Sequence, residues 1–234
     1  MSRLRRRMGR CSVLALAALI ASASAPTFAE NTEDLSDVGQ SEDQWRFRVL
    51  LDGKTIGFHH YDVAQVGQRR VVETRAEFDV KIFFINAYRY RHSLRSTWDG
   101  GCLESLESNT DANGEAVSVI GKRSGNQFLV DSGSSETALP ACVMNFAYWD
   151  PRILEQTSLL NPQTGEYLDV SVNRLGEQEL LLDGVSVEAD AYRITGKNLR
   201  IDLWYAKGTR QWIALESLTE SDRVIRYERE NENA

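Results

Sequence analysis

The stretch YRYRHSLRSTW, residues 88–98, alternates apolar and polar side chains and decides the fold class. One face carries Tyr88, Tyr90, His92, Leu94 and Trp98, and the other carries Arg89, Arg91, Ser93, Arg95 and Thr97. Successive side chains of a β-strand point to opposite faces, so this pattern predicts a strand with one buried and one wet face. The arginines are typical of a solvated surface that pairs with acids on neighbouring strands, although an anionic headgroup or a partner protein would also fit them.

Similar β-prone stretches lie on both sides of this strand, and turn sequences such as Asp52-Gly53 separate them. The expected strands are residues 45–49, 54–64, 69–85, 88–98, 103–110, 116–122, 127–131, 166–173, 179–182, 185–195, 199–206, 211–218 and 223–229. Connections of hairpin length, without intervening helices, predict an all-β protein built as one antiparallel meander of about twelve strands. A meander of this length must hide its edges, so we expect a barrel or a half-open barrel.

Residues 141–160, ACVMNFAYWDPRILEQTSLL, interrupt the alternation. Met144, Ala147 and Tyr148 share a face if this stretch is helical, and Asp150-Pro151 is a typical helix start. We therefore expect one short helical insertion, or a loop that acts as a lid, within a single β domain that covers residues 44–230.

The N-terminus has the three-part pattern of a secretory signal peptide. Five arginines precede residue 11, the apolar run CSVLALAALIASA covers residues 11–23, and small residues follow. The predicted signal peptide is residues 1–29, with cleavage after Ala29, and cleavage after Ala25 is the alternative. Residues 30–43, ENTEDLSDVGQSED, are polar and acidic, and we expect a flexible arm there.

Cleavage of the signal peptide would leave a strongly acidic chain. The leader contains five of the 27 basic residues and none of the 34 acidic ones. Without it, the mature chain has a formal charge of 22 − 34 = −12. Such a charge disfavours nucleic acid as a partner. No later apolar run is long enough for a membrane span, so we expect a periplasmic or secreted protein without an integral span after cleavage.

Export would leave Cys102 and Cys142 in an oxidising compartment. Two cysteines in that setting favour one disulfide, and two free buried thiols are the alternative. Neither cysteine belongs to a Cys-x-x-Cys motif or has a neighbouring basic residue, so a reactive thiol is not indicated.

Several segments resemble exported proteobacterial proteins that are catalogued only as domains of unknown function. The resemblance lies in five segments: WRFRVLLDGKTIGFHH at 45–60, YWD at 148–150, LNPQTG at 160–165, IDLWYA at 201–206 and WIALE at 212–216. Ala206 departs from the pattern, because an acid is expected there. The resemblance implies a curved antiparallel sheet distantly similar to periplasmic lipoprotein carriers, and it implies no catalytic residue.

The residues that could carry chemistry are few. His59 and His60 are adjacent, so they face opposite sides of a strand and cannot share a metal. His60 alternates with Ile56 and Phe58, and we expect it to face inward towards His92, either as a functional pair or as hydrogen-bonded core residues. No nucleotide, metal-binding or nucleophile-elbow motif is present, so we expect no cofactor and no metal site.

Aromatic side chains suggest what a hollow interior would hold. The candidates for a ligand cavity are Tyr88, Tyr90, His92, His60, Trp98, Tyr148, Trp149 and Trp204. Hollow sheets with aromatic walls bind apolar ligands, so the first hypothesis is a non-enzymatic carrier of a lipid-like or other apolar ligand. The alternatives are an envelope scaffold or assembly factor that binds a partner protein, and a hydrolase-type enzyme that uses His60 or His92. The sequence does not decide whether the interior is hollow or packed.

Overall fold

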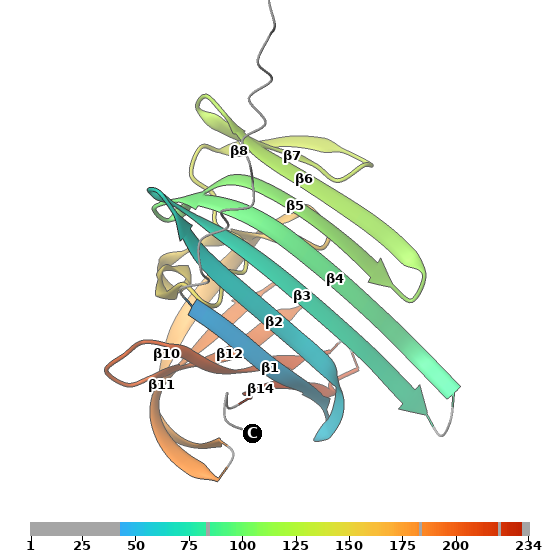
Figure 1. The fold of residues 1–234 in the computed structure, drawn as a ribbon, viewed down its shortest axis with the longest axis vertical. Helices are drawn as coiled ribbons and strands as arrows, with labels where there is room; N and C mark the ends of the chain where they lie inside the picture. The colour runs from blue at the N-terminus through green and yellow to red at the C-terminus, as the bar shows by residue number, and fades with distance from the viewer. Residues whose placement is uncertain (1–42, 83–84, 183, 220, 231–234) are drawn as a thin grey trace, which may run out of the picture. The chain divides into compact units, whose positions relative to one another are not determined.

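The computed structural model describes residues 43–82, 85–182, 184–219 and 221–230. Their backbone forms one antiparallel sheet of 14 strands in a meander (Figure 1). The predicted signal peptide, and the acidic arm up to residue 42, lie outside the described residues. No helix in the described part of the chain is long and apolar enough to cross a membrane.

The strands are β1 (Asp43–Leu51), β2 (Lys54–Val66), β3 (Arg69–Ile82), β4 (Ile85–Asp99), β5 (Cys102–Ala112), β6 (Glu115–Ser124), β7 (Gln127–Asp131), β8 (Glu136–Pro140), β9 (Ser158–Leu160), β10 (Tyr167–Leu182), β11 (Val185–Gly196), β12 (Leu199–Ala206), β13 (Trp212–Leu218) and β14 (Val224–Arg229).

The all-β antiparallel prediction is confirmed, and the strand count differs for local reasons. Asp52 and Gly53 have positive φ angles of 49° and 78°, which is the backbone of the tight turn expected between β1 and β2. The expected strands 166–173 and 179–182 are one strand, β10, whose ladder continues through an irregularity at 174–176. The short strands β8 and β9 were not predicted. Strand β8 follows the loop-like run SGSS at 132–135 and ends in a proline, and the three residues of β9 are too few to show alternation.

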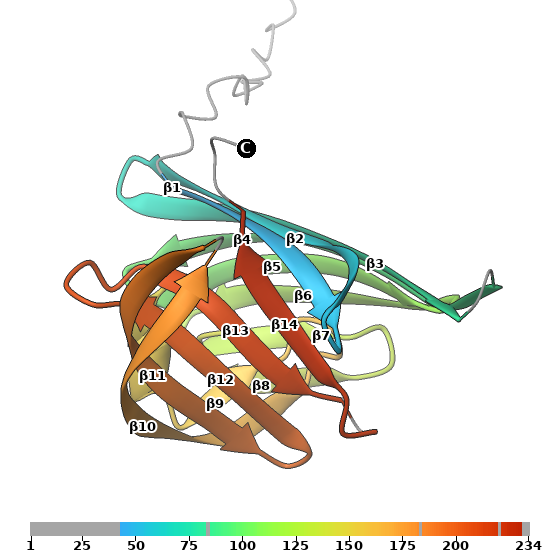
Figure 2. The ribbon, with the colours of Figure 1, turned by 90° about the horizontal axis from the view of Figure 1, so that it is seen from below.

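The sheet is curled but not closed. Its order runs from β8 through β1, across the β1–β14 pair, and on to β9, so β8 and β9 are the two edges. Seen from below, β1–β4 lie on one side of the molecule and β11–β14 lie opposite them (Figure 2). A half-open arrangement was one of the two predicted forms, and a closed barrel is excluded.

The interior between the two halves holds the main core. Phe47 of β1 and Trp212 of β13 are both fully buried, and their ring centroids lie 4.3 Å apart. Leu203 of β12 and Leu106 of β5 belong to the same core cluster. The apolar alternation of the sequence therefore places the main apolar cluster between the two halves of the curled sheet.

Residues 141–166, called the bridging segment below, connect the edge strand β8 to β10 and include β9. The predicted helical insertion is wrong: the segment contains only one 3₁₀ turn, Pro151–Glu155. Asp150 caps that turn as predicted, because its side chain accepts a hydrogen bond from the backbone N–H of Arg152 at 3.0 Å. Residue 145 instead forms a parallel bridge to residue 160, and the chain from there to Asp150 runs through tight turns, such as the one closed by the Asp150 N–H and the Ala147 carbonyl at 2.9 Å, so it has no helical face.

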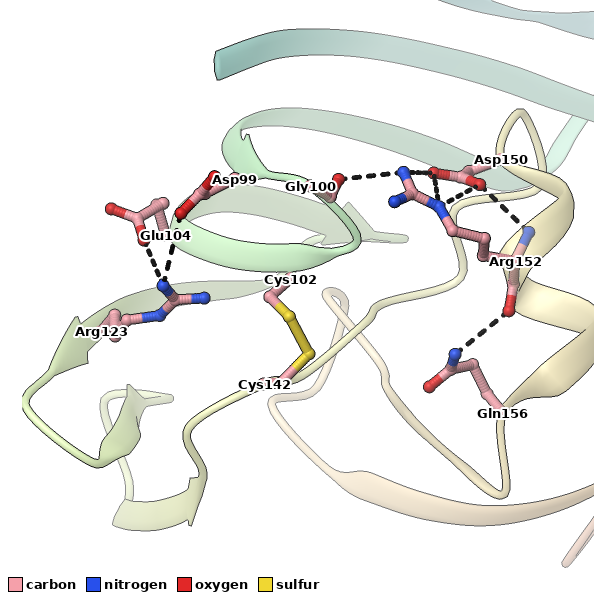
Figure 3. Close-up of a disulfide and its surroundings, with 9 residues drawn as sticks. All are labelled: Asp99, Gly100, Cys102, Glu104, Arg123, Cys142, Asp150, Arg152 and Gln156. Carbon is pink, nitrogen blue, oxygen red and sulfur yellow. Dashed lines mark hydrogen bonds and ion pairs between the residues drawn. A yellow bond between two sulfur atoms is a disulfide. The ribbon is translucent and has the colours of Figure 1, made fainter. Parts of the chain in front are cut away.

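A disulfide and several hydrogen bonds fix the bridging segment to the sheet (Figure 3). Cys142 is bonded to Cys102 at the start of β5, and the backbone N–H of Leu103 donates to the carbonyl of Val143 at 2.9 Å. The Arg152 guanidinium donates to the backbone carbonyl of Gly100 at 2.9 Å and also pairs with Asp150. The segment is thus held at several points along its length.

The outer face of β3 and β4 is charged, and the charges are paired as the sequence indicates. Arg91 pairs with Asp79 at 2.8 Å, Arg89 lies 3.5 Å from the same carboxylate, and Arg95 pairs with Glu73. The arginine row of the sequence is therefore part of a cross-strand ion-pair lattice.

Candidate functional site

A β-bulge in β2 decides which side chains face the interior. Val49 of β1 lies opposite Gly57, whereas Leu50 lies opposite Thr55, so Ile56 is an extra residue in the ladder. Gly57 packs against β3 so closely that a Cβ there would lie 1.8 Å from the carbonyl oxygen of Glu77. The extra residue reverses the alternation, and His59 rather than His60 faces inward.

The neighbouring strands β2, β3 and β4 each contribute one side chain to a row that faces the interior. His59 of β2 is the ladder partner of Ala76 of β3, and Ala76 is the partner of His92 of β4. Two strand spacings separate the backbones of the histidines by about 10 Å. The small side chain of Ala76 lies between the two imidazoles and leaves space above the sheet.

That space is a cavity of about 350 Å³ inside the curl. The first half of the sheet supplies His59, Tyr61, Thr74, Ala76, Phe78, Tyr88, Tyr90, His92 and Leu94. The bridging segment supplies Asn145, Phe146, Tyr148, Asn161, Pro162 and Gln163. The second half supplies Leu168, Leu199, Ile201, Leu215, Ser217, Ile225 and Tyr227.

The lining is aromatic and aliphatic with a few neutral polar groups. Among the described residues, no Asp, Glu, Lys or Arg lines this cavity. Two other hollows, of about 370 and 470 Å³, are different because ion-paired side chains line them. Arg75 and Glu77 line the first, and Arg95 and Glu73 line the second. The interior cavity is therefore the candidate site, and its chemistry suits an apolar molecule with a small number of polar atoms.

His59 is the polar centre of this cavity. Its Nδ1 lies 3.1 Å from the hydroxyl of Tyr227 and 3.3 Å from the hydroxyl of Tyr61. Its Nε2 is buried and has no hydrogen-bond partner among the described residues. Burial, with a smaller contribution from His92, holds the pKa of the His59 imidazole well below its usual range, so the ring is neutral at physiological pH.

The second histidine is neutral for the same reason. Burial lowers the pKa of His92 to about 4, and its Nδ1 lies 2.9 Å from the hydroxyl oxygen of Thr110. Burial also raises the pKa of Tyr90, Tyr148 and Tyr227, so these phenols remain protonated. No cluster of three metal-ligating side chains occurs in the described part of the chain. The site is a set of neutral hydrogen-bonding groups in an apolar wall.

Four of the eight candidate residues line the cavity. Tyr88, Tyr90 and His92 lie on β4, and Tyr148 lies on the bridging segment. Tyr90 stacks on Phe78 with ring centroids 5.0 Å apart, and Tyr88 is 40% exposed, which places it where the cavity meets solvent.

The other four candidates lie elsewhere. Trp98 and Trp149 pack edge to face with ring centroids 5.5 Å apart, and both belong to the main core. Trp204 belongs to a separate apolar cluster, and its indole N–H donates to the side-chain oxygen of Gln178 at 2.9 Å. His60 is the ladder partner of Arg46 on the outward face, and its ring packs at a tilt against Phe58 with centroids 4.3 Å apart. The predicted inward orientation of His60 is wrong, because the bulge in β2 shifts the alternation.

Several cavity residues were not predicted from the sequence. His59, Tyr61 and Phe78 lie in segments that were predicted to be strands, but His59 was assigned to the opposite face. Tyr227 lies on the last strand, far from the others in sequence, and it reaches the cavity because β14 pairs with β1. The motif Ile56-Gly57 was a signal for the bulge, because an isolated glycine in a strand pattern indicates a bulge or a close backbone approach.

Comparison with known proteins assigns the chain to a family. The model of DUF6134, a domain of unknown function, matches residues 47–230. The chain belongs to the DUF6134 family. No curated protein matches the DUF6134 chain significantly.

Among solved structures, the DUF6134 fold is similar to a crystal structure from Brucella abortus that is described as a beta-barrel-like protein of domain of unknown function DUF1849. The TM-score is 0.59 at 13% sequence identity, over 80% of this chain and 95% of the other. At this identity the likeness concerns the fold alone.

Proposed function

We propose that this DUF6134 protein is a non-enzymatic binding or carrier protein that holds a lipid-like or other apolar ligand in its interior cavity. The observation that carries the proposal is the cavity of about 350 Å³, walled by aromatic and aliphatic side chains. Small-molecule sites in proteins have volumes of about 300–1,000 Å³ and are mostly apolar. An empty space of this size in a core lined by Phe78, Tyr90 and Tyr148 lacks the packing that usually stabilises a β-sheet core.

We further propose that the protein works in the periplasm or after secretion. The N-terminal signal pattern supports this proposal, and so does the Cys102–Cys142 disulfide, because structural disulfides persist in oxidising compartments. An exported carrier needs a site that shields an apolar ligand from water, and the bridging segment covers one side of the cavity with Phe146 and Tyr148.

The neutral fluorescent probe N-phenyl-1-naphthylamine tests the proposal. We expect saturable fluorescence enhancement with one site per chain in the purified mature protein. Ala76→Leu fills the cavity from its wall and should abolish the enhancement. Ala116→Leu, which makes the same change at an exposed position of β6, should leave it unchanged. Equal binding by the wild type and Ala76→Leu, or no binding by any of the three proteins, would overturn the proposed function.

A further inference from the structure

We propose that the side-chain carboxamide of Asn145 anchors the ligand of this cavity, and that the ligand is an uncharged molecule with an apolar body and an oxygen group, a hydroxyl or a carbonyl, that hydrogen-bonds to this carboxamide. This inference rests on the proposed function and deepens it, because it names a binding residue and the class of ligand for the same cavity.

The Asn145 side chain is buried in the cavity wall without a hydrogen-bond partner. Asn145 lines the cavity and is only 3% exposed. Its carboxamide makes no hydrogen bond to any of the described residues. Burying an amide without a partner is unfavourable, and nearly all buried polar groups in folded proteins bond to protein, water or a ligand. The partners that Asn145 lacks in the protein can come from the contents of the cavity.

The carboxamide atoms remain within reach, unlike Nε2 of His59. Among the described residues, the side-chain nitrogen and oxygen atoms that are both fully enclosed and unpartnered are Nε2 of His59 and Nε of Arg123. Neither carboxamide atom of Asn145 belongs to this set, so both keep surface that a group the size of a water molecule can contact. A hydroxyl or carbonyl oxygen is such a group.

The backbone holds Asn145 in a fixed position. Asn145 is bridged to Leu160 of β9, beside the bond from the Leu160 N–H to the Met144 carbonyl at 2.9 Å. The N–H of Ala147 donates to the Asn145 carbonyl at 2.7 Å. A polar group on a backbone that is already ordered loses little further freedom when it binds, so it is suited to orienting a ligand.

Two hydroxyls of the sheet add to the polar part of the wall. Thr74 of β3 and Tyr90 of β4 are buried and line the cavity. Neither hydroxyl has a hydrogen-bond partner among the described residues, and neither is fully enclosed. Hydroxyl and carboxamide groups can both donate and accept hydrogen bonds, so these three side chains suit either a hydroxyl or a carbonyl on the ligand.

The depth of Asn145 decides the charge of the group that it binds. An oxygen bonded to so deeply buried a side chain lies inside the cavity, away from the mouth at Tyr88. No Asp, Glu, Lys or Arg of the described residues lines the cavity, and burial lowers the pKa of both His59 and His92, so no positive charge is available there near neutral pH. A carboxylate would exchange its hydration for neutral partners only, which is unfavourable.

Four probes with the same chain length separate these features by competition with N-phenyl-1-naphthylamine at about pH 7.5. Nonane has no polar atom, 2-nonanone has a carbonyl, 2-nonanol has a hydroxyl, and nonanoate is ionised. We expect 2-nonanone and 2-nonanol to bind at least about tenfold more tightly than nonanoate, because only the anion must be desolvated without a counter-charge.

The variant Asn145→Leu isolates the hydrogen bond, because it replaces the carboxamide with an apolar group of similar size. We expect the affinity of 2-nonanone or 2-nonanol, divided by that of nonane, to fall about fivefold or more. The ratio that falls further identifies the oxygen group. The urea midpoint should not fall, because the carboxamide makes no contact with a protein partner that the variant would lose. Asn173→Leu, the same change at an exposed position of β10 outside the cavity lining, should leave both ratios unchanged.

The side-chain N–H resonances of Asn145 provide a readout in the wild type. They should shift when 2-nonanone or 2-nonanol binds and much less when nonane binds. This measurement decides the question even if Asn145→Leu does not fold.

The outcomes separate this inference from the proposed function. It fails, and the proposed function stands, if the fluorescent probe and nonane bind but both ratios are the same in Asn145→Leu as in the wild type. Competition by nonanoate as strong as that by 2-nonanone, or an equal response of the Asn145 resonances to nonane, would also overturn it. If no probe binds at all, both proposals fail.

Discussion

Removal of the Cys102–Cys142 disulfide should destabilise the protein and loosen the cavity wall. The two cysteines are 40 residues apart in the chain, and the closed loop contains β5, β6, β7 and β8. In the chain-entropy description, a disulfide that closes a loop of this length lowers the entropy of the unfolded chain by about 13 cal/mol/K. At 25 °C this corresponds to about 4 kcal/mol of stability.

Other contacts should keep the fold when the disulfide is lost. The bridging segment retains the backbone bond between Leu103 and Val143, the edge-to-face pair of Trp98 and Trp149, and the bond from the Ser108 hydroxyl to the carbonyl of Pro162. We therefore expect a folded but less stable protein. For a domain of this size, the melting temperature should fall by roughly 8–16 °C.

Urea unfolding of the double variant Cys102→Ala/Cys142→Ala, compared with the oxidised wild type, measures this loss. The reduced wild type is the matched control, because it has an open loop without a substitution. We expect both to lose about 4 kcal/mol and to release N-phenyl-1-naphthylamine faster than the oxidised protein. A loss below about 1 kcal/mol in both would refute the reasoning, because it would mean that the loop is equally constrained without the bond.

Three further predictions concern the bulge, the buried histidine and a tryptophan that was wrongly assigned to the cavity. Gly57→Ala should lower the free energy of unfolding by about 3 kcal/mol or more in urea titrations, because the added Cβ would clash with the carbonyl oxygen of Glu77. A loss below about 1 kcal/mol would argue against the tight bulge. Burial lowers the pKa of His92 to about 4 in the folded protein, against about 6.5 in the unfolded chain, so acid favours the unfolded chain. The contribution of His92 to stability should fall by about 3 kcal/mol between pH 6.5 and 4, and His92→Gln should remove that part of the pH dependence while the part due to His59 remains. If His92→Gln has the same pH profile as the wild type, His92 is not buried as described. Trp204→Ala should lower the stability by about 3–5 kcal/mol and leave the affinity for the fluorescent probe unchanged, because Trp204 packs in a separate cluster. Weaker probe binding by this variant would show that the cluster is coupled to the cavity.

The sequence predicts the sheet well because long strands with one wet face repeat a two-residue pattern. Residues 88–98 show this most clearly, and the structure places Tyr90, His92, Leu94 and Trp98 on the buried face as predicted. The bridging segment was predicted less well. Asp150 and Pro151 correctly signalled a capped turn. The disulfide and the bridge between residues 145 and 160 are tertiary contacts that fix the neighbouring chain in a non-helical conformation, and no local pattern shows them.

The cavity could be predicted only in part, for three physical reasons. One extra residue in β2 reverses the alternation, so a strict two-residue pattern assigns His60 instead of His59 to the interior. The second reason is sequence distance: Tyr227 meets His59 only because β14 pairs with β1, and hairpin patterns do not show which distant strands pair. Ala76 illustrates a third difficulty, since its small size opens the cavity without any distinctive motif.

Native mass spectrometry of the mature protein purified from periplasm tests the central claim most directly, when it is followed by organic extraction and analysis of the extract. The account predicts a co-purifying apolar species at near-stoichiometric amount, and its absence from Ala76→Leu purified in parallel. A mass equal to the polypeptide alone, unchanged after incubation with envelope lipids, would contradict the claim that the interior cavity holds an apolar ligand.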